Sequence, residues 1–206
     1  IIGFDFQGHG IRVGGIIGAS GDNEMGIAGV NWNVKIMWIQ NNLQVDKIIE
    51  GYEYVYQNRK LYNESNGQKG AVVVASNGSF GIDGDSPDYP DGLQISDNPL
   101  FPIWCEVHEM LGEVGVLNVG STNNKTLNVD EVGDMPSICQ TEHLIVVAES
   151  DKQDELSSGY GKINVDLTAP GDGSPTTGAD NTYSTIGSTS GAAPHVAGGI
   201  ALLYSL

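Results

Sequence analysis

The chain has 206 residues, of which nine are Lys or Arg and 26 are Asp or Glu, so its formal net charge is −17. With 39% hydrophobic and 17% charged residues, this composition predicts one globular domain and excludes a disordered acidic tail. The negative charge argues against nucleic acids and anionic membranes as partners, because both would repel the protein. No apolar stretch approaches the roughly 18 residues needed to span a bilayer.

Short apolar runs alternate with helical patterns along the chain. A helix could begin at His9, and further helices are predicted at 45–56, 102–111 and 192–206. Strands are predicted at 34–40, 71–75, 114–119, 144–148 and 163–167. Buried strands separated by helices indicate an α/β fold of three layers, with a mostly parallel sheet between helices on both faces. We find no repeat or linker, so residues 1–206 form one domain.

Loops that follow the strands are expected to carry the ligand site, because ligands of parallel sheets bind at the carboxyl ends of the strands. The loop Gly81–Pro99 contains five aspartates, and the loop Asp151–Gly161 is polar. The first of these loops offers the oxygen atoms that calcium prefers, and a solvated acidic loop explains the pattern equally well.

Two cysteines, Cys105 and Cys139, fit neither a zinc site nor a disulfide-dense small protein. Their spacing leaves open a single disulfide or a pair of buried thiols. The chain opens on Ile1 with no initiator Met and no signal-peptide pattern, so we expect it to be a processed or cropped piece of a longer protein.

Two residues could form the centre of a hydrolytic site. Ser190 stands among small residues before an apolar helix, where free backbone N–H groups and the helix dipole favour an oxyanion. His9, flanked by glycines, could act as its general base. Each residue alone also has an ordinary structural interpretation, an N-cap for Ser190 and a turn for His9.

Four ordered blocks of sequence resemble the subtilase family. His9–Ala19 (HGIRVGGIIGA) is similar to H-G-T-H-V-A-G-I-I-G-A, the segment around the family's catalytic His. Ser188–Gly198 (STSGAAPHVAG) resembles G-T-S-M-A-A-P-H-V-A-G, the segment around its nucleophile. Asn77–Gly81 resembles the family segment N-x-S-[LFW]-G, and Gly115–Asn124 aligns with the strand that ends in its oxyanion Asn. The resemblance covers nearly the whole chain.

This resemblance implies a serine endopeptidase with a subtilisin-like fold. Ser190 would be the nucleophile, His9 the general base and Asn124 the donor to the oxyanion. His195 matches a structural histidine of the family and is kept out of the mechanism. The residues implied to contact a polypeptide substrate are Ser79, Phe80, Gly81, Gly120, Ser121 and Thr122. No cofactor is required, and a propeptide that acts as inhibitor or chaperone is an expected partner.

The family's third catalytic residue, an Asp in a D-[ST]-G setting upstream of the His, has no counterpart here. Asp5 lies in the loop leading to His9, and we do not assign it that role. We therefore expect a catalytic domain that lacks its N-terminal strand, and a loss of about 10⁴ in turnover for the chain alone. Ile11, Arg12, Ser188 and Gly191 also depart from the family pattern. The alternative is a non-catalytic, peptide-binding relative.

The resemblance also bears on the cysteines, on calcium and on localisation. The sequence around Cys105 and Cys139 resembles secreted bacterial subtilases in which such a pair forms a disulfide, which implies a bridge and a secreted protein. Subtilases often bind calcium, and Asp83–Asp91 could supply ligands to a structural calcium ion. No residue is assigned as a metal ligand, because this loop lacks a clear ligand spacing.

Two other hydrolase classes are excluded by their motifs. Ile1-Ile2-Gly3 suggests a trypsin-like protease, but that class needs an all-β pattern and a G-D-S-G-G-P segment. An α/β-hydrolase would need G-x-S-x-G, and Gly187–Gly191 (GSTSG) places the serines at the wrong offset.

Overall fold

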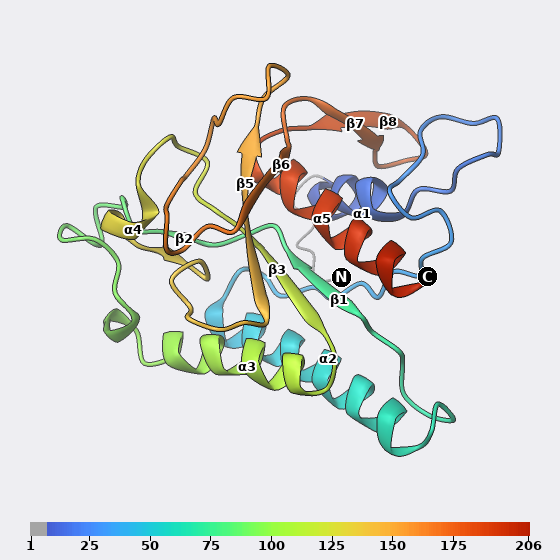
Figure 1. The fold of residues 1–206 in the computed structure, drawn as a ribbon, viewed down its shortest axis with the longest axis horizontal. Helices are drawn as coiled ribbons and strands as arrows, with labels where there is room; N and C mark the ends of the chain where they lie inside the picture. The colour runs from blue at the N-terminus through green and yellow to red at the C-terminus, as the bar shows by residue number, and fades with distance from the viewer. Residues whose placement is uncertain (1–7) are drawn as a thin grey trace.

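A computed structural model describes residues 8–206. Its centre is a parallel sheet with the strand order β1 (Ala75–Gly78), β3 (Leu117–Ser121), β5 (Leu144–Ser150) and β6 (Leu167–Pro170). Helices cover both faces of this sheet, α2 and α3 on one side and α1 and α5 on the other (Figure 1). The predicted α/β fold with three layers is thereby confirmed.

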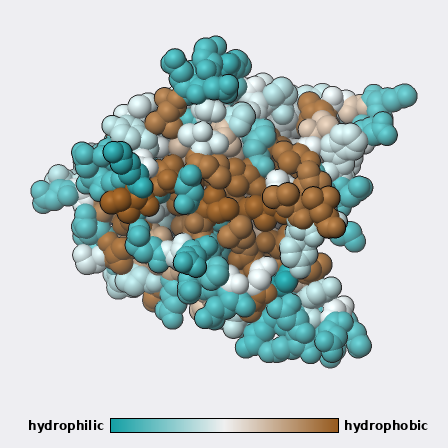
Figure 2. Space-filling model, viewed as in Figure 1, coloured by the Kyte–Doolittle hydropathy of each residue, from teal (hydrophilic) through white to brown (hydrophobic). Residues whose placement is uncertain are grey.

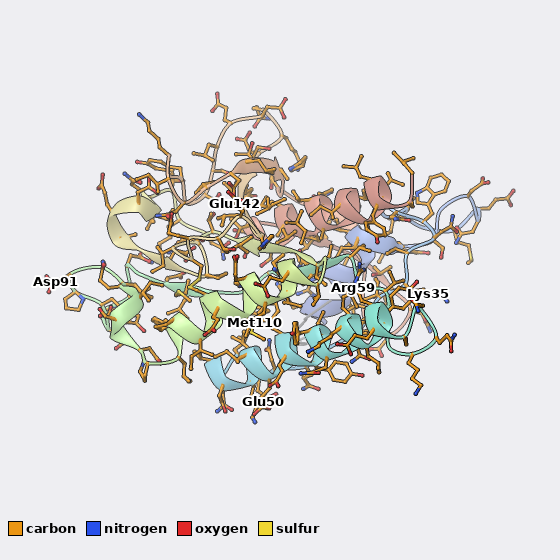
Figure 3. The ribbon with its side chains drawn as sticks, turned by 60° about the horizontal axis from the view of Figure 1, so that its bottom comes forward. Lys35, Glu50, Arg59, Asp91, Met110 and Glu142 are labelled. Atoms are coloured by element: carbon orange, nitrogen blue, oxygen red, sulfur yellow. A yellow bond between two sulfur atoms is a disulfide. The ribbon has the colours of Figure 1, made fainter. Side chains whose placement is uncertain are left out.

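One face of the sheet is covered by α2 (Val45–Glu64) and α3 (Phe101–Glu113), which run side by side (Figure 3). Pro102 lies in the first turn of α3, where its missing N–H is not needed. Arg59, labelled in Figure 3, is buried and donates from α2 to the carbonyl oxygens of Val73 (2.7 Å) and Val114 (3.1 Å). The largest fully buried side chains of this layer are Tyr52, Phe101, Trp104, His108 and Leu111.

The opposite face is covered by α1 (His9–Gly18) and α5 (Thr189–Tyr204). A Cβ atom at Gly198 would lie 2.7 Å from Val30 Cβ, so the close approach of α5 to Val30 depends on a glycine at this position. A hairpin of β7 (Ser174–Thr177) and β8 (Tyr183–Ile186) lies beside α1. The hydroxyl groups of Thr176 and Thr177 donate to backbone carbonyls of α1, which fixes the start of that helix.

A second, small ladder lies outside the central sheet. It joins β2 (Ile82–Asp83) to β4 (Asp134–Met135) in antiparallel register, and the Met135–Pro136 peptide is cis. The short helices η1 (Ile95–Asp97) and α4 (Val129–Val132) lie in the neighbouring loops. The sequence predicted none of these elements, because two-residue strands and single helical turns have no periodicity of their own.

Three predicted strands differ from the structure. Of 163–167, only Leu167 belongs to a strand, as the first residue of β6. Residues 34–40 form no named strand, and of 71–75 only Ala75 belongs to one. Instead, 33–37 and 71–75 line an apolar groove of about 740 Å³, together with Ala197 and Ala201 of α5. Figure 2 shows apolar side chains gathered over the middle of the face of the molecule that is seen in Figure 1. Apolar, β-branched sequence favours an extended chain, but a strand also needs a partner, and these two segments do not pair with each other.

The predicted disulfide is present and joins Cys105 of α3 to Cys139, across 34 residues of sequence. Among residues 8–206, no helix is both long enough and apolar enough to cross a membrane.

Candidate active site

A cavity of about 350 Å³ lies where the loops after the strands meet the helix ends. His9 at the start of α1, Ser190 in the first turn of α5 and Asn124 in the loop after β3 all line it. Of the residues implied to contact substrate, the cavity walls include Ser79, Phe80, Gly81, Ser121 and Thr122. Gly120 does not line the cavity. It lies in β3, where an added Cβ would be 3.2 Å from a ring atom of Pro136.

Ser190 is held by the segment before it. Ser188, the N-cap of α5, has φ 62° and ψ −171°, a conformation that is almost confined to glycine. Its backbone N–H donates to Glu149 Oε1 at 3.1 Å. The Ser190 hydroxyl lies 3.4 Å from the carbonyl oxygen of Ser79, and the Ser79 hydroxyl donates to the carbonyl of Ser190 at 3.2 Å. The nucleophile candidate is therefore fixed against the Ser79–Gly81 segment.

The orientation of the Asn124 amide is set by its neighbours. Its Oδ1 accepts hydrogen bonds from Ser188 Oγ (2.5 Å) and from the backbone N–H of Thr189 (3.3 Å). A backbone N–H can only donate, so the atom that faces it must be the carbonyl oxygen. The Asn124 NH₂ group is thereby left to donate elsewhere, as an oxyanion donor must.

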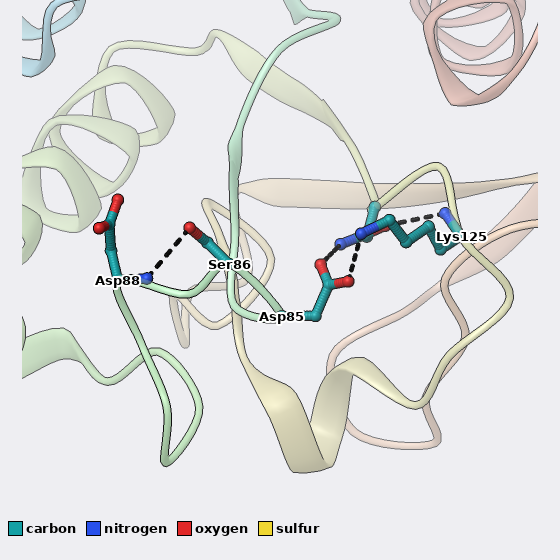
Figure 4. A network of polar contacts seen from close by, with 5 residues as sticks. Asp85, Ser86, Asp88 and Lys125 are labelled. Atoms are coloured by element: carbon teal, nitrogen blue, oxygen red, sulfur yellow. Dashed lines mark hydrogen bonds and ion pairs between the residues drawn. The ribbon is translucent and has the colours of Figure 1, made fainter.

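The loop that carries Asn124 is braced from outside by Asp85 (Figure 4). Asn123 Nδ2 donates to Asp85 Oδ1 at 2.9 Å, and Lys125 Nζ lies 2.5 Å from Asp85 Oδ2. These hydrogen bonds from Lys125 and Asn123 lower the pKa of Asp85. The Asp85 carboxylate therefore holds both sequence neighbours of Asn124 in place.

His9 is the first residue of α1 and follows Gly8, whose φ of 79° suits glycine. This turn places His9 on the cavity wall with Arg12, one turn further along. His195 lies elsewhere, with its Nδ1 2.8 Å from the carbonyl of Gly191 inside α5. Asp5 lies outside the described residues.

Two acidic residues that sequence reasoning did not assign to the site, Asp83 and Asp134, also line the cavity. Asp134 is 1% exposed and accepts a hydrogen bond from Ser137 Oγ at 2.5 Å. Burial raises the pKa of Asp134 well above its usual value, and the charges of Asp83 and Asp85 raise it further. Burial and Asp85 also raise the pKa of Asp83.

The loop Asp83–Asp91, which the sequence offered as a source of calcium ligands, contributes Asp83 and Asp85 to the region beside the cavity. Among the residues that the structure describes, no group of three or more His, Cys, Asp or Glu side chains could hold a metal ion. Both carboxylate oxygens of Asp85 are already engaged by Asn123 and Lys125.

A comparison with protein families matches residues 3–206 to the subtilase family of peptidases, S8. The chain is a subtilase. It is 32% identical over 201 residues to thermitase from Thermoactinomyces vulgaris, a match that spans 97% of this chain and 62% of thermitase. It is 30% identical to subtilisin-like protease 2 of Plasmodium falciparum, over 98% of this chain and 14% of that protein.

Another relative, the intracellular serine protease of Paenibacillus polymyxa, is 28% identical over 98% of this chain and 55% of its own length. The subtilase chain thus spans less than two thirds of each of these relatives.

Solved structures agree on the fold. A cold-adapted subtilisin-like serine proteinase superposes with a TM-score of 0.70 at 23% identity, over 100% of this chain and 68% of the other. The epidermin leader peptide processing protease of Staphylococcus aureus gives a TM-score of 0.72 at 20% identity, over 97% and 53% of the two chains.

Proposed function

We propose that this subtilase is a serine endopeptidase that hydrolyses peptide bonds in polypeptide substrates. The observation that carries the proposal is the single cavity onto which His9, Ser190 and Asn124 converge from three separate elements. The fixed orientation of the Asn124 amide adds support, because it leaves a donor for developing negative charge.

In the proposed reaction, Ser190 Oγ attacks the carbonyl carbon of the scissile bond while His9 accepts the hydroxyl proton. The carbonyl oxygen gains the negative charge, and the Asn124 amide donates to it. His9 then gives its proton to the leaving amine as the C–N bond breaks. Water, deprotonated by His9, hydrolyses the acyl–Ser190 ester and returns the enzyme to its starting state.

The substrate chain would lie along Ser79–Gly81. This segment follows β1 directly and is tied to Ser190 by two hydrogen bonds. An extended peptide that pairs with its backbone would bring one carbonyl to Ser190 Oγ, as in other cases of strand addition. The small residues Ser79 and Gly81 leave room for the substrate backbone.

We also propose that the protein is secreted and that a propeptide segment is a partner. The Cys105–Cys139 disulfide supports secretion, because such bridges persist in oxidising compartments. Family membership alone does not, since the Paenibacillus polymyxa relative is named an intracellular protease.

A fluorophosphonate probe, which labels only activated serines, tests the proposal. We expect labelling of a longer gene product that contains this chain, and little labelling of the 206 residues alone, because they contain no counterpart of the family's catalytic Asp. Ser190→Ala should abolish the labelling, and His9→Ala should strongly decrease it. Ser205→Ala, at the exposed far end of the same helix, is the matched control and should label normally. The experiment is run on the 206-residue chain and on any longer gene product that contains it.

A longer gene product that folds and stays unlabelled would overturn the proposal. In that case, peptide binding that is retained without labelling would assign the chain to the alternative class, a non-catalytic peptide-binding subtilase.

A further inference from the structure

The cavity is lined by acidic side chains in addition to its catalytic candidates. Ser190 and His9 line one part of it, and Asp83 and Asp134 line another. We call these two carboxylates the acidic wall. A volume of about 350 Å³ lies at the small end of the range for ligand pockets and leaves room for a long side chain.

The fold forces the two carboxylates together. Asp83 in β2 and Asp134 in β4 are directly opposite each other in the antiparallel ladder. Directly opposed residues of an antiparallel pair point to the same face, and like charges in this position repel each other. Asp134 is buried and Asp83 is exposed, so one carboxylate of the pair lies in the interior and the other faces solvent.

No basic side chain neutralises this wall from within the described part of the chain. Residues 8–206 contain no salt bridge to Asp83 or Asp134. The charge of Lys125 lowers the pKa of Asp83, but Lys125 itself is bound to Asp85 (Figure 4). Arg12 lines the cavity near Gly8, and it is not among the charges that shift the pKa of either aspartate.

A buried carboxylate without a counter-charge is costly unless something neutralises it. Protonation is one solution, and the raised pKa of both aspartates favours it. A bound cation is the other. A metal ion would need more ligands than this wall offers, because no third acidic or imidazole group joins these two among the described residues. An ammonium or guanidinium group needs only the two carboxylates and the Ser137 hydroxyl nearby.

We propose that the acidic wall binds the lysine or arginine side chain of the substrate residue whose carbonyl Ser190 attacks. The carbonyl carbon of that substrate residue must lie against Ser190 Oγ. Because Ser190 lines the same cavity as Asp83 and Asp134, the side chain of this residue is the part of the substrate that can enter it. This inference rests on the proposed function for the identity of the ligand. The inference adds a substrate class to the proposed function, namely polypeptides that are cleaved after a basic residue.

The test measures binding without cleavage, in the Ser190→Ala background. Two fluorescent peptides that differ only in a C-terminal lysine or norleucine are titrated, with anisotropy as the readout. Norleucine has nearly the length of lysine and no charge. We expect the lysine peptide to bind about 10- to 100-fold more tightly, as for a charge-assisted contact. Adding Asp134→Asn should reduce this ratio to nearly one and leave norleucine binding in place.

Asp88→Asn is the matched control, because Asp88 lies in the same loop, is exposed, and does not line the cavity (Figure 4). It should preserve the lysine preference. Equal binding of the two peptides, no binding of either, or a preference unaffected by Asp134→Asn would overturn the inference. Lysine-selective binding in a protein that no fluorophosphonate labels would instead support the acidic wall and reject the catalytic proposal.

Discussion

Two buried titratable side chains in this subtilase have shifted pKa values for the same physical reason, and only one of them belongs to the site. Burial raises the pKa of Asp134 and lowers the pKa of His108 to about 4. Asp134 lines the cavity that contains Ser190, whereas His108 is fully buried in α3 with its ring centroid 4.7 Å from that of Tyr52. The difference teaches that a shifted pKa marks a candidate site only where a ligand can reach the group.

If this comparison is right, substitutions on the cavity change activity more than stability. Asn124→Ala should reduce the rate of probe labelling and peptide cleavage by about 10²–10³, a range established for the equivalent loss in subtilisin. The thermal unfolding midpoint should stay close to that of the parent, since within residues 8–206 the side-chain hydrogen bonds of Asn124 reach only Ser188 and Thr189 at the start of α5. A parallel loss of stability and activity would mean that Asn124 is structural.

The buried histidine should show the reverse behaviour, an effect on stability that depends on pH. Its folded-state pKa of about 4 lies below the ordinary 6.5, so below pH 6.5 the unfolded chain binds a proton that the folded chain does not. The free energy of unfolding should therefore fall as the pH drops from 6.5 towards 4, by up to about 3 kcal/mol. Urea unfolding at several pH values between 4 and 7 measures this change in the free energy of unfolding.

His108→Gln removes the titrating group and should flatten this part of the pH profile. His143→Gln, at a partly exposed position, is the control that keeps it. An unchanged profile in His108→Gln would assign acid sensitivity to the carboxylates instead.

The smallest expected effect concerns backbone strain beside the nucleophile. Ser188→Gly should relieve the cost of a non-glycine residue at φ 62°, about 1–3 kcal/mol. It also removes the hydroxyl that donates to Asn124, worth about 1 kcal/mol. We expect a net stabilisation of about 1 kcal/mol in urea unfolding, with turnover reduced less than in Asn124→Ala. A destabilised variant would mean that the hydrogen bond outweighs the strain.

Sequence reasoning predicted the parts of the fold that have a local signature. The apolar run at 144–148 became β5, and the helical stripe from Val45 became α2, which extends to Glu64. The acidic wall has no such signature. Asp83 and Asp134 are distant in sequence and meet only through a two-residue ladder, so the pattern around Asp83 suggested a calcium loop instead.

The strand predictions at 34–40 and 71–75 failed for the same reason, a dependence on distant segments. Side-chain composition reports the tendency to be extended, whereas pairing depends on where other segments lie. The orientation of the Asn124 amide is likewise a property of its neighbours across the cavity and not of its own motif.

The disulfide has a consequence for handling this protein. Cys139 lies a few residues beyond Asp134, so the bridge to α3 tethers the segment that carries the acidic wall. A loop of 34 residues closed in this way stabilises a fold by about 3–4 kcal/mol in the chain-entropy account. Protein produced in a reducing cytosol and protein exported to an oxidising compartment are therefore expected to differ in stability and in the order of this wall. Preparations of the two kinds should be assayed separately, with the thiol content of each determined first.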